Sequence, residues 1–283
     1  MEIIYLRFPH ITDKIFELLN NKSLTKCREV HKNWLWFIDE ADFPWSRILK
    51  KYPMENGQTL LHIAAKTGQL HKCELMFNEE EKKNLPKDDH GITPLHLSAH
   101  HAHLKICELL MKVAKEKLPQ DNEGSTPFHE AAKMGHMEIC ELFMDISDDE
   151  VPKDNEGYTP FHEAAIQGHL NLCKIFNENA NGKSPISEIG YTPLHAAAFW
   201  GKHLVCEWLM KNTEDKNLTD WLGCTPLHLA GMHNNLKACK VIIDNEGDNA
   251  VEICPFCIMI RNEKSREYLC HYTRKKFKQG KYS

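Results

Sequence analysis

The chain has 283 residues, of which 42% are hydrophobic and 27% charged, a composition typical of globular proteins and not of disordered or collagen-like ones. Its formal net charge of −5 argues against a general nucleic-acid-binding surface. The longest apolar run, residues 253–260, is far shorter than the roughly 20 residues that cross a bilayer. The N-terminus also lacks the basic region of a signal peptide. We therefore expect a cytoplasmic or nuclear protein with no membrane association, whose 11 cysteines are reduced thiols.

Residues 1–50 contain no glycine and carry apolar residues at helical spacing. The first apolar set comprises Ile11, Ile15, Leu18 and Leu19, and the second comprises Cys27, Val30, Trp34 and Ile38. Ser23 lies between the two sets and is a good helix N-cap. The segment is therefore predicted to be a small helical domain.

This segment resembles an F-box. The resemblance is carried by Phe8-Pro9, Ile15-Phe16, Leu18-Leu19, Ser23-Leu24, Cys27-Arg28-Glu29-Val30, Trp34 and Trp45, with Phe8 standing where leucine is usual. It implies docking onto a Skp-type adaptor that leads to a cullin ubiquitin ligase. The implied adaptor-binding residues are Pro9, Ile15, Leu24, Val30 and Trp34. The alternative is a plain helical cap that seals the repeats which follow, since stacked repeats need a cap in any case.

Residues 53–250 repeat with a period of 33 or 34. The pattern Gly-x-Thr-[Pro/Leu]-[Leu/Phe]-His begins at Gly57, Gly91, Gly124, Gly157, Gly190 and Gly223. The glycine permits a turn with positive φ, the threonine can cap a helix, and proline suits the first helical position. Four later glycines are expected as helix C-caps: Gly68, Gly135, Gly168 and Gly201. A cysteine sixteen residues after each of the six glycines is expected to lie buried on a second helix.

The repeated unit resembles the ankyrin repeat, most closely in Gly91-Ile92-Thr93-Pro94-Leu95-His96-Leu97-Ser98-Ala99. The resemblance implies an all-α solenoid of six repeats, with hairpin-like loops that line a concave face. The repeat histidines are expected to hydrogen-bond to loop backbone. Leu60 replaces the proline in the first repeat, and Ala102 and Asn234 replace the capping glycine in the second and sixth repeats.

The resemblance also implies where a target would bind: the two residues before each glycine, the one after it, and the ninth and tenth after it. In the first three repeats these positions are mostly polar, and Glu55, Asp89 and Glu123 would suit a basic stretch of a partner. In the last three repeats they are largely apolar, as binding hot spots are. The expected target-binding residues are Tyr158, Ile166, Ile189, Tyr191, Phe199, Trp200, Trp221, Leu222 and Met232. The alternative is that neighbours or a C-terminal cap partly cover some of them.

Residues 251–273 contain Pro255-Phe256-Cys257-Ile258, which resembles a degenerate repeat, and are expected to form a C-terminal cap. Residues 274–283 form a basic tail that we expect to be disordered; it is either a nuclear signal or an ordinary solvated terminus.

Two motifs suggest metal chemistry but lack the required ligands. Cys254 and Cys257 have metal-ligand spacing, yet the following Cys270-His271 pair is adjacent and rarely supplies two ligands to one ion. His129-Glu130 and His162-Glu163 begin like a zinc-protease motif but lack the second histidine four residues after the first. We therefore expect no catalytic site, no metal and no cofactor.

The two resemblances together imply a non-enzymatic, substrate-recognition subunit of a Skp–cullin–F-box ubiquitin ligase. The F-box would hold the adaptor while the ankyrin repeats present a target protein whose identity the sequence does not give. The alternative is an ankyrin scaffold or inhibitor without a ligase link.

Overall fold

The computed structural model describes residues 55–76, 84–147, 151–213 and 218–246. Across these ranges all regular secondary structure is helical. The expected F-box-like domain (1–50), capping repeat (251–273) and basic tail (274–283) lie outside the described residues. So do the five expected adaptor-binding residues, Pro9, Ile15, Leu24, Val30 and Trp34.

The chain divides into two compact units. The first unit comprises residues 1–98 and 105–116, and the second comprises residues 99–104 and 117–283. The described helices of the first unit are η1 (Glu55–Gly57), α6 (Leu60–Lys66), α7 (Leu70–Met76), most of α8 (Pro94–His100) and α9 (Leu104–Val113).

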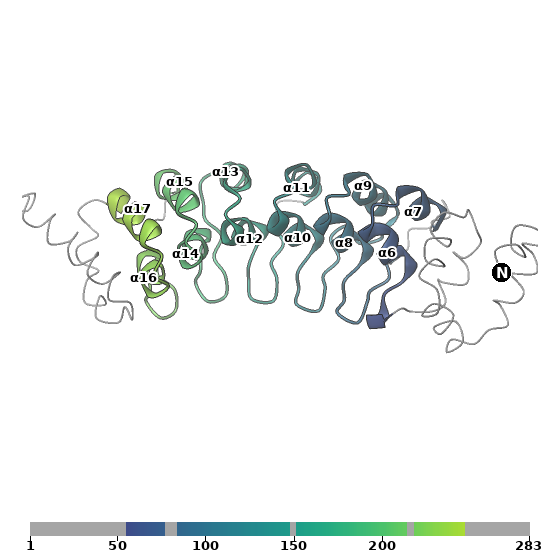
Figure 1. Ribbon diagram of the computed structural model, residues 1–283, viewed down its shortest axis with the longest axis horizontal. Coiled ribbons are helices and arrows are strands. Elements are labelled where there is room, and N and C mark those ends of the chain that lie inside the picture. Colours follow the sequence, from purple (N-terminus) through teal and green to yellow (C-terminus); the bar gives the residue numbers. More distant parts are fainter. Residues whose placement is uncertain (1–54, 77–83, 148–150, 214–217, 247–283) are drawn as a thin grey trace, which may run out of the picture. The chain divides into compact units, whose positions relative to one another are not determined.

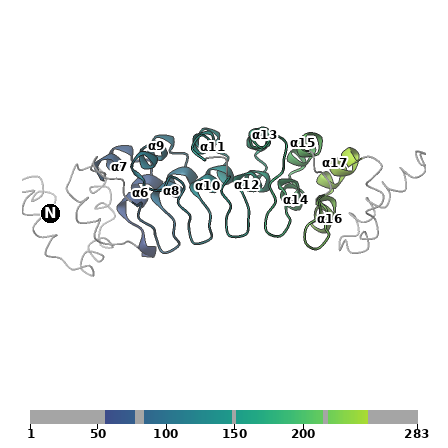
Figure 2. The ribbon, with the colours of Figure 1, turned by 180° about the vertical axis from the view of Figure 1, so that it is seen from behind.

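The second unit is built from pairs of short helices in two rows (Figures 1 and 2). The first helix of each pair is α10 (Pro127–Met134), α12 (Pro160–Gln167), α14 (Pro193–Phe199) or α16 (Pro226–Met232). The second is α11 (Met137–Met144), α13 (Leu170–Asn179), α15 (His203–Asn212) or α17 (Leu236–Glu246). Successive first helices pack against one another, and α15 packs against both α13 and α17. Loops project beyond the row of first helices in both views.

Each first helix of the second unit begins at the threonine that the repeat pattern predicted. Thr126, Thr159, Thr192 and Thr225 are N-caps with extended backbone, and a proline follows each of them. The histidine three residues later completes a capping box, because its side chain accepts a hydrogen bond from the N–H of the threonine. The Thr-Pro-x-His sequence therefore fixes the start of every first helix in this unit.

A left-handed residue lies at or near the end of each helix that opens a repeat, with one difference from the prediction. Gly135 (φ 82°) and Gly168 (φ 87°) are the predicted C-caps. The C-caps of α6 and α14 are instead the preceding residues, Thr67 and Trp200, and Gly68 and Gly201 follow with φ of 77° and 68°. In the two repeats without the glycine, Ala102 and Asn234 adopt the same conformation, with φ of 63° and 60°. The backbone geometry is thus kept where the sequence departs from glycine.

The core lies between the two rows of helices. The six phased cysteines, Cys73, Cys107, Cys140, Cys173, Cys206 and Cys239, are fully buried, as predicted. Burial raises the pKa of Cys173 to about 12, so this thiol stays protonated at neutral pH. Phe128 packs against Phe143 and Phe176, with ring centroids 5.9 and 5.7 Å apart. The contact with Phe176 joins neighbouring helix pairs, because Phe176 belongs to the repeat after that of Phe128.

Candidate functional site

Each loop before a first helix is a tight turn held by one side chain. The Oδ1 atom of Asp121 accepts hydrogen bonds from the N–H groups of Glu123 (2.9 Å) and Ser125 (2.8 Å). Asp88, Asp154 and Asp220 repeat this geometry in their own loops, and the Oγ atom of Ser187 accepts from Tyr191 in the fifth. These residues were not predicted from the sequence. Their recurrence three residues before five of the six repeat glycines was the available signal.

Successive loops of the second unit are joined by main-chain hydrogen bonds. Asn155 N–H donates to Glu123 O (3.0 Å), Glu188 N–H to Glu156 O (2.9 Å), and Trp221 N–H to Ile189 O (3.1 Å). These residues and Leu222 form what we call the loop-tip row: Glu123, Asn155, Glu156, Glu188, Ile189, Trp221 and Leu222. The row is ordered, because a main-chain hydrogen bond joins each loop to the next one along it.

The repeat histidines tie each helix start to the following loop. His162 Nδ1 accepts from Thr159 N–H at 3.1 Å, so His162 Nε2 carries the proton and donates to Tyr191 O at 3.0 Å. The Nε2 atoms of His62, His129 and His195 make the same contact with Ile92 O, Tyr158 O and Cys224 O, at 2.9, 3.0 and 3.2 Å. The predicted hydrogen bonding to loop backbone is confirmed for these four. Burial lowers the pKa of His162 to about 4, so the imidazole is neutral at physiological pH.

Five of the nine expected target-binding residues are exposed in the second unit. Leu222 is 84% exposed, Trp221 75%, Trp200 57%, Met232 52% and Ile189 37%. Ile189, Trp221 and Leu222 lie on the loop-tip row, while Trp200 and Met232 lie at the ends of α14 and α16. We call these five residues the apolar surface.

The other four expected residues, Tyr158, Ile166, Tyr191 and Phe199, are only half-buried. The Tyr158 ring packs edge-on against His162, with centroids 5.2 Å apart, and the Tyr191 ring stacks on His195 at 5.6 Å. Phe199 packs against His233 at 3.8 Å. The alternative that neighbours partly cover these rings therefore holds for Phe199, which contacts the next repeat, while the two tyrosines pack against histidines of their own repeats.

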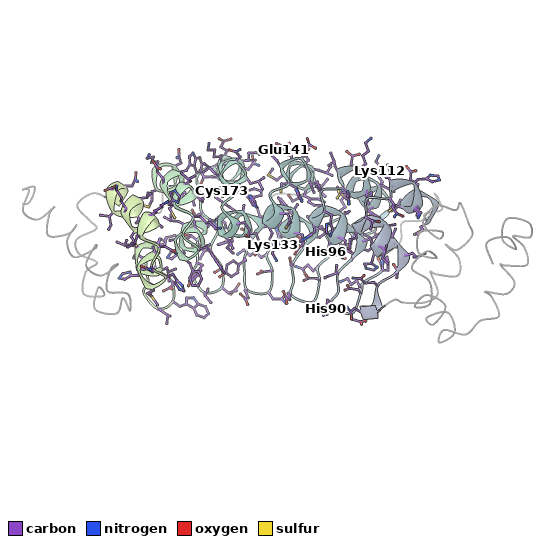
Figure 3. All side chains as sticks on the ribbon, in the orientation of Figure 1. His90, His96, Lys112, Lys133, Glu141 and Cys173 are labelled. Atoms are coloured by element: carbon purple, nitrogen blue, oxygen red, sulfur yellow. The ribbon has the colours of Figure 1, made fainter. Side chains whose placement is uncertain are left out.

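In the second unit, the loops and the second helices lie on opposite sides of the row of first helices (Figure 1). In the second unit, Figure 3 shows Lys133 on the first-helix side and Glu141 among the second helices. On the first-helix side, the Nδ1 atom of His100 lies 2.7 Å from Glu130 Oε2, and this hydrogen-bonded contact is partly buried. The second helices expose a single large apolar side chain among the described residues, Leu204, at 56%.

The described residues contain neither a metal-binding cluster nor a helix long and apolar enough to span a membrane. No group of three or more His, Cys, Asp and Glu side chains there is arranged to hold a metal ion. Cys254 and Cys257 lie outside the described residues. None of the described helices has the length and apolar character needed to span a bilayer.

A family model for ankyrin repeats, with three copies, matches residues 46–121, 114–186 and 176–253. No F-box domain is detected, and residues 1–45 lie outside the match. No curated protein matches the chain.

Proposed function

Because this chain belongs to the ankyrin repeat family, whose repeats act as protein-interaction modules, we propose that it binds a target protein through the apolar surface of its second unit. The observation that carries this proposal is the exposure of Trp221 and Leu222 on the sixth loop and of Trp200 at the end of α14. Large apolar side chains that face water together carry an aggregation risk, and such surfaces usually mark interaction sites. Tryptophan is also enriched among the residues that dominate binding energy.

Affinity purification of the intact chain with mass spectrometry tests this proposal. The variant Trp200→Ala/Trp221→Ala should bind the captured target at least tenfold more weakly, since truncating a central anchor costs about 2 kcal/mol or more of binding free energy. Leu204→Ala is the matched control, because it removes an equally exposed apolar side chain from a second helix. Tyr191 is a poorer probe, because its ring stacks on His195 and its loss also alters packing. Equal capture by the double variant and the wild type would contradict the proposal.

We further propose that the chain is a substrate-recognition subunit of a Skp–cullin–F-box ubiquitin ligase, with residues 1–50 as the adaptor-binding domain. Its support is the sequence pattern from Phe8-Pro9 to Trp45, together with the finding that the repeat match begins only at residue 46. In this proposal six repeats present the target, since each of the six repeat glycines precedes a pair of helices, and residues 251–273 cap them.

Direct titration of the intact chain with a Skp-type adaptor separates this role from that of a scaffold or inhibitor without a ligase link. Leu24→Glu and Pro9→Glu should each abolish adaptor binding, while Leu222→Glu, the same kind of change on the apolar surface, should leave it intact. If the wild-type chain does not bind the adaptor, residues 1–50 act as a cap and the scaffold role stands.

A further inference from the structure

The chemistry of the loop-tip row changes halfway along it. Glu123, Glu156 and Glu188 place one exposed carboxylate on each of three successive loops. The apolar side chains of Ile189, Trp221 and Leu222 then follow on the fifth and sixth loops. The change falls between the adjacent residues Glu188 and Ile189. A partner that lies along the row meets an acidic half and then an apolar half.

The acidic half has few cations to balance it. Residues 121–126, 154–159, 187–192 and 220–225 contain six carboxylates and no lysine or arginine, and Lys153 is the nearest cation in the sequence. The inner carboxylates of Asp121, Asp154 and Asp220 are turned toward the loop N–H groups. The outer carboxylates face water, where a chain of like charges attracts cationic groups and repels anionic surfaces.

The two halves are held at a fixed separation, because main-chain hydrogen bonds close each step of the row. Helices that pack side by side are about 8–10 Å apart, so the two steps from the loop of Glu156 to the loop of Trp221 span roughly 20 Å. An extended chain advances about 3.3–3.6 Å per residue. About six extended residues therefore bridge the acidic and apolar halves.

We propose that the partner is an extended protein segment in which a cluster of Lys or Arg is separated by about six residues from a cluster of large apolar side chains. The apolar cluster docks on Trp200, Trp221 and Leu222 and supplies most of the affinity. The basic cluster meets Glu123 and Glu156 and sets the direction in which the segment lies. This inference rests on the proposed function of the apolar surface. The acidic half repels nucleic acid and anionic membranes, because both carry negatively charged phosphate groups.

Selection from a phage library of random peptides of about 16 residues, long enough to span the row, tests the inference with the intact chain as bait. The enriched peptides should carry both clusters at the stated spacing. One enriched peptide is then synthesised with a fluorophore and titrated by anisotropy against the variants. Selection of no peptide, or of peptides without a basic cluster, overturns the inference.

Charge-reversal variants locate the basic cluster. Glu123→Lys/Glu156→Lys should weaken peptide binding at least tenfold at about 0.05 M salt. The effect should be smaller at about 0.5 M salt, because salt screens exposed charges. Glu141→Lys/Glu178→Lys makes the same change in net charge on exposed residues of α11 and α13 and should leave affinity within about twofold. Equal weakening by the two pairs overturns the inference.

The aromatic double variant distinguishes the two proposals. If Trp200→Ala/Trp221→Ala abolishes binding of a selected peptide that lacks basic residues, the apolar surface is a binding site and only the charge pattern is wrong. If the double variant binds every selected peptide as the wild type does, the proposed function of the apolar surface fails as well.

Discussion

The Nε2 atom of His162 lies 3.0 Å from the main-chain oxygen of Tyr191, which belongs to the following repeat. The Nδ1 atom of the same ring accepts from Thr159 N–H, so the imidazole joins a helix start in one repeat to a loop in the next. This geometry requires a neutral ring, because protonation of Nδ1 would place two donors face to face. The contact between these repeats therefore depends on pH.

We expect stability to fall as the pH drops from about 6.5 to about 4. Burial lowers the pKa of His162 to about 4 in the folded protein and also lowers the pKa values of His62, His129 and His195. In this window the unfolded chain binds protons that the folded chain does not, so the stabilisation is present above pH 6.5 and is lost below it. For His162 alone the loss approaches about 3 kcal/mol.

Urea unfolding at about pH 7.5 and about pH 5 measures this effect as a lower midpoint at the lower pH. His162→Gln removes one titrating group and should flatten the dependence, even if it lowers the midpoint at both values. A wild-type midpoint that does not change between the two pH values would contradict the account.

Ala102→Gly should stabilise the chain by about 0.5–1 kcal/mol. Ala102 has φ 63°, where an L-residue with a Cβ atom carries a strain of roughly 1–2 kcal/mol that glycine avoids. The extra freedom of glycine in the unfolded chain offsets part of this gain. Ala180→Gly is the matched control: Ala180 follows α13 with φ −83°, so the same change should only destabilise. Equal melting shifts for the two variants would rule out relief of strain.

Phe128→Ala should cost about 3–5 kcal/mol, whereas Trp221→Ala should change stability by less than about 0.5 kcal/mol. Phe128 is 2% exposed and lies against two other phenylalanines, while Trp221 is 75% exposed. Chemical unfolding of both variants checks the contrast. Unfolding of the Trp221 variant would mean that this ring belongs to the core, and the apolar surface would lose its strongest residue.

Cys224 should react with iodoacetamide at least tenfold faster than Cys173 in the native protein. Cys173 is fully buried and burial raises its pKa to about 12, whereas Cys224 is half-buried. Only the thiolate reacts, and it must also be reached by the reagent. Peptide mapping by mass spectrometry after timed alkylation gives both rates. Similar native rates would show that the helix pair around Cys173 opens readily.

The sequence predicted the backbone of the repeats well, because their turns and caps depend on local residue types. Thr159, Pro160 and His162 specify a helix start, and Gly168 specifies its end, without reference to any other repeat. The candidate site was harder to predict. Tyr191 and Trp200 look alike as aromatic residues at variable positions, yet Tyr191 stacks on His195 while Trp200 is exposed. Exposure depends on how the ring lies against neighbouring side chains, which residue type does not specify.

The central claim is that a target protein lies on the apolar surface, and site-specific photo-crosslinking tests it most directly. A photoreactive benzoylphenylalanine is placed at position 221, at position 200, or at position 204 on the second helix α15, in the intact chain. Positions 221 and 200 should crosslink to one and the same protein, and position 204 should give no crosslink to that protein. A crosslink to the target from position 204 alone would contradict this claim.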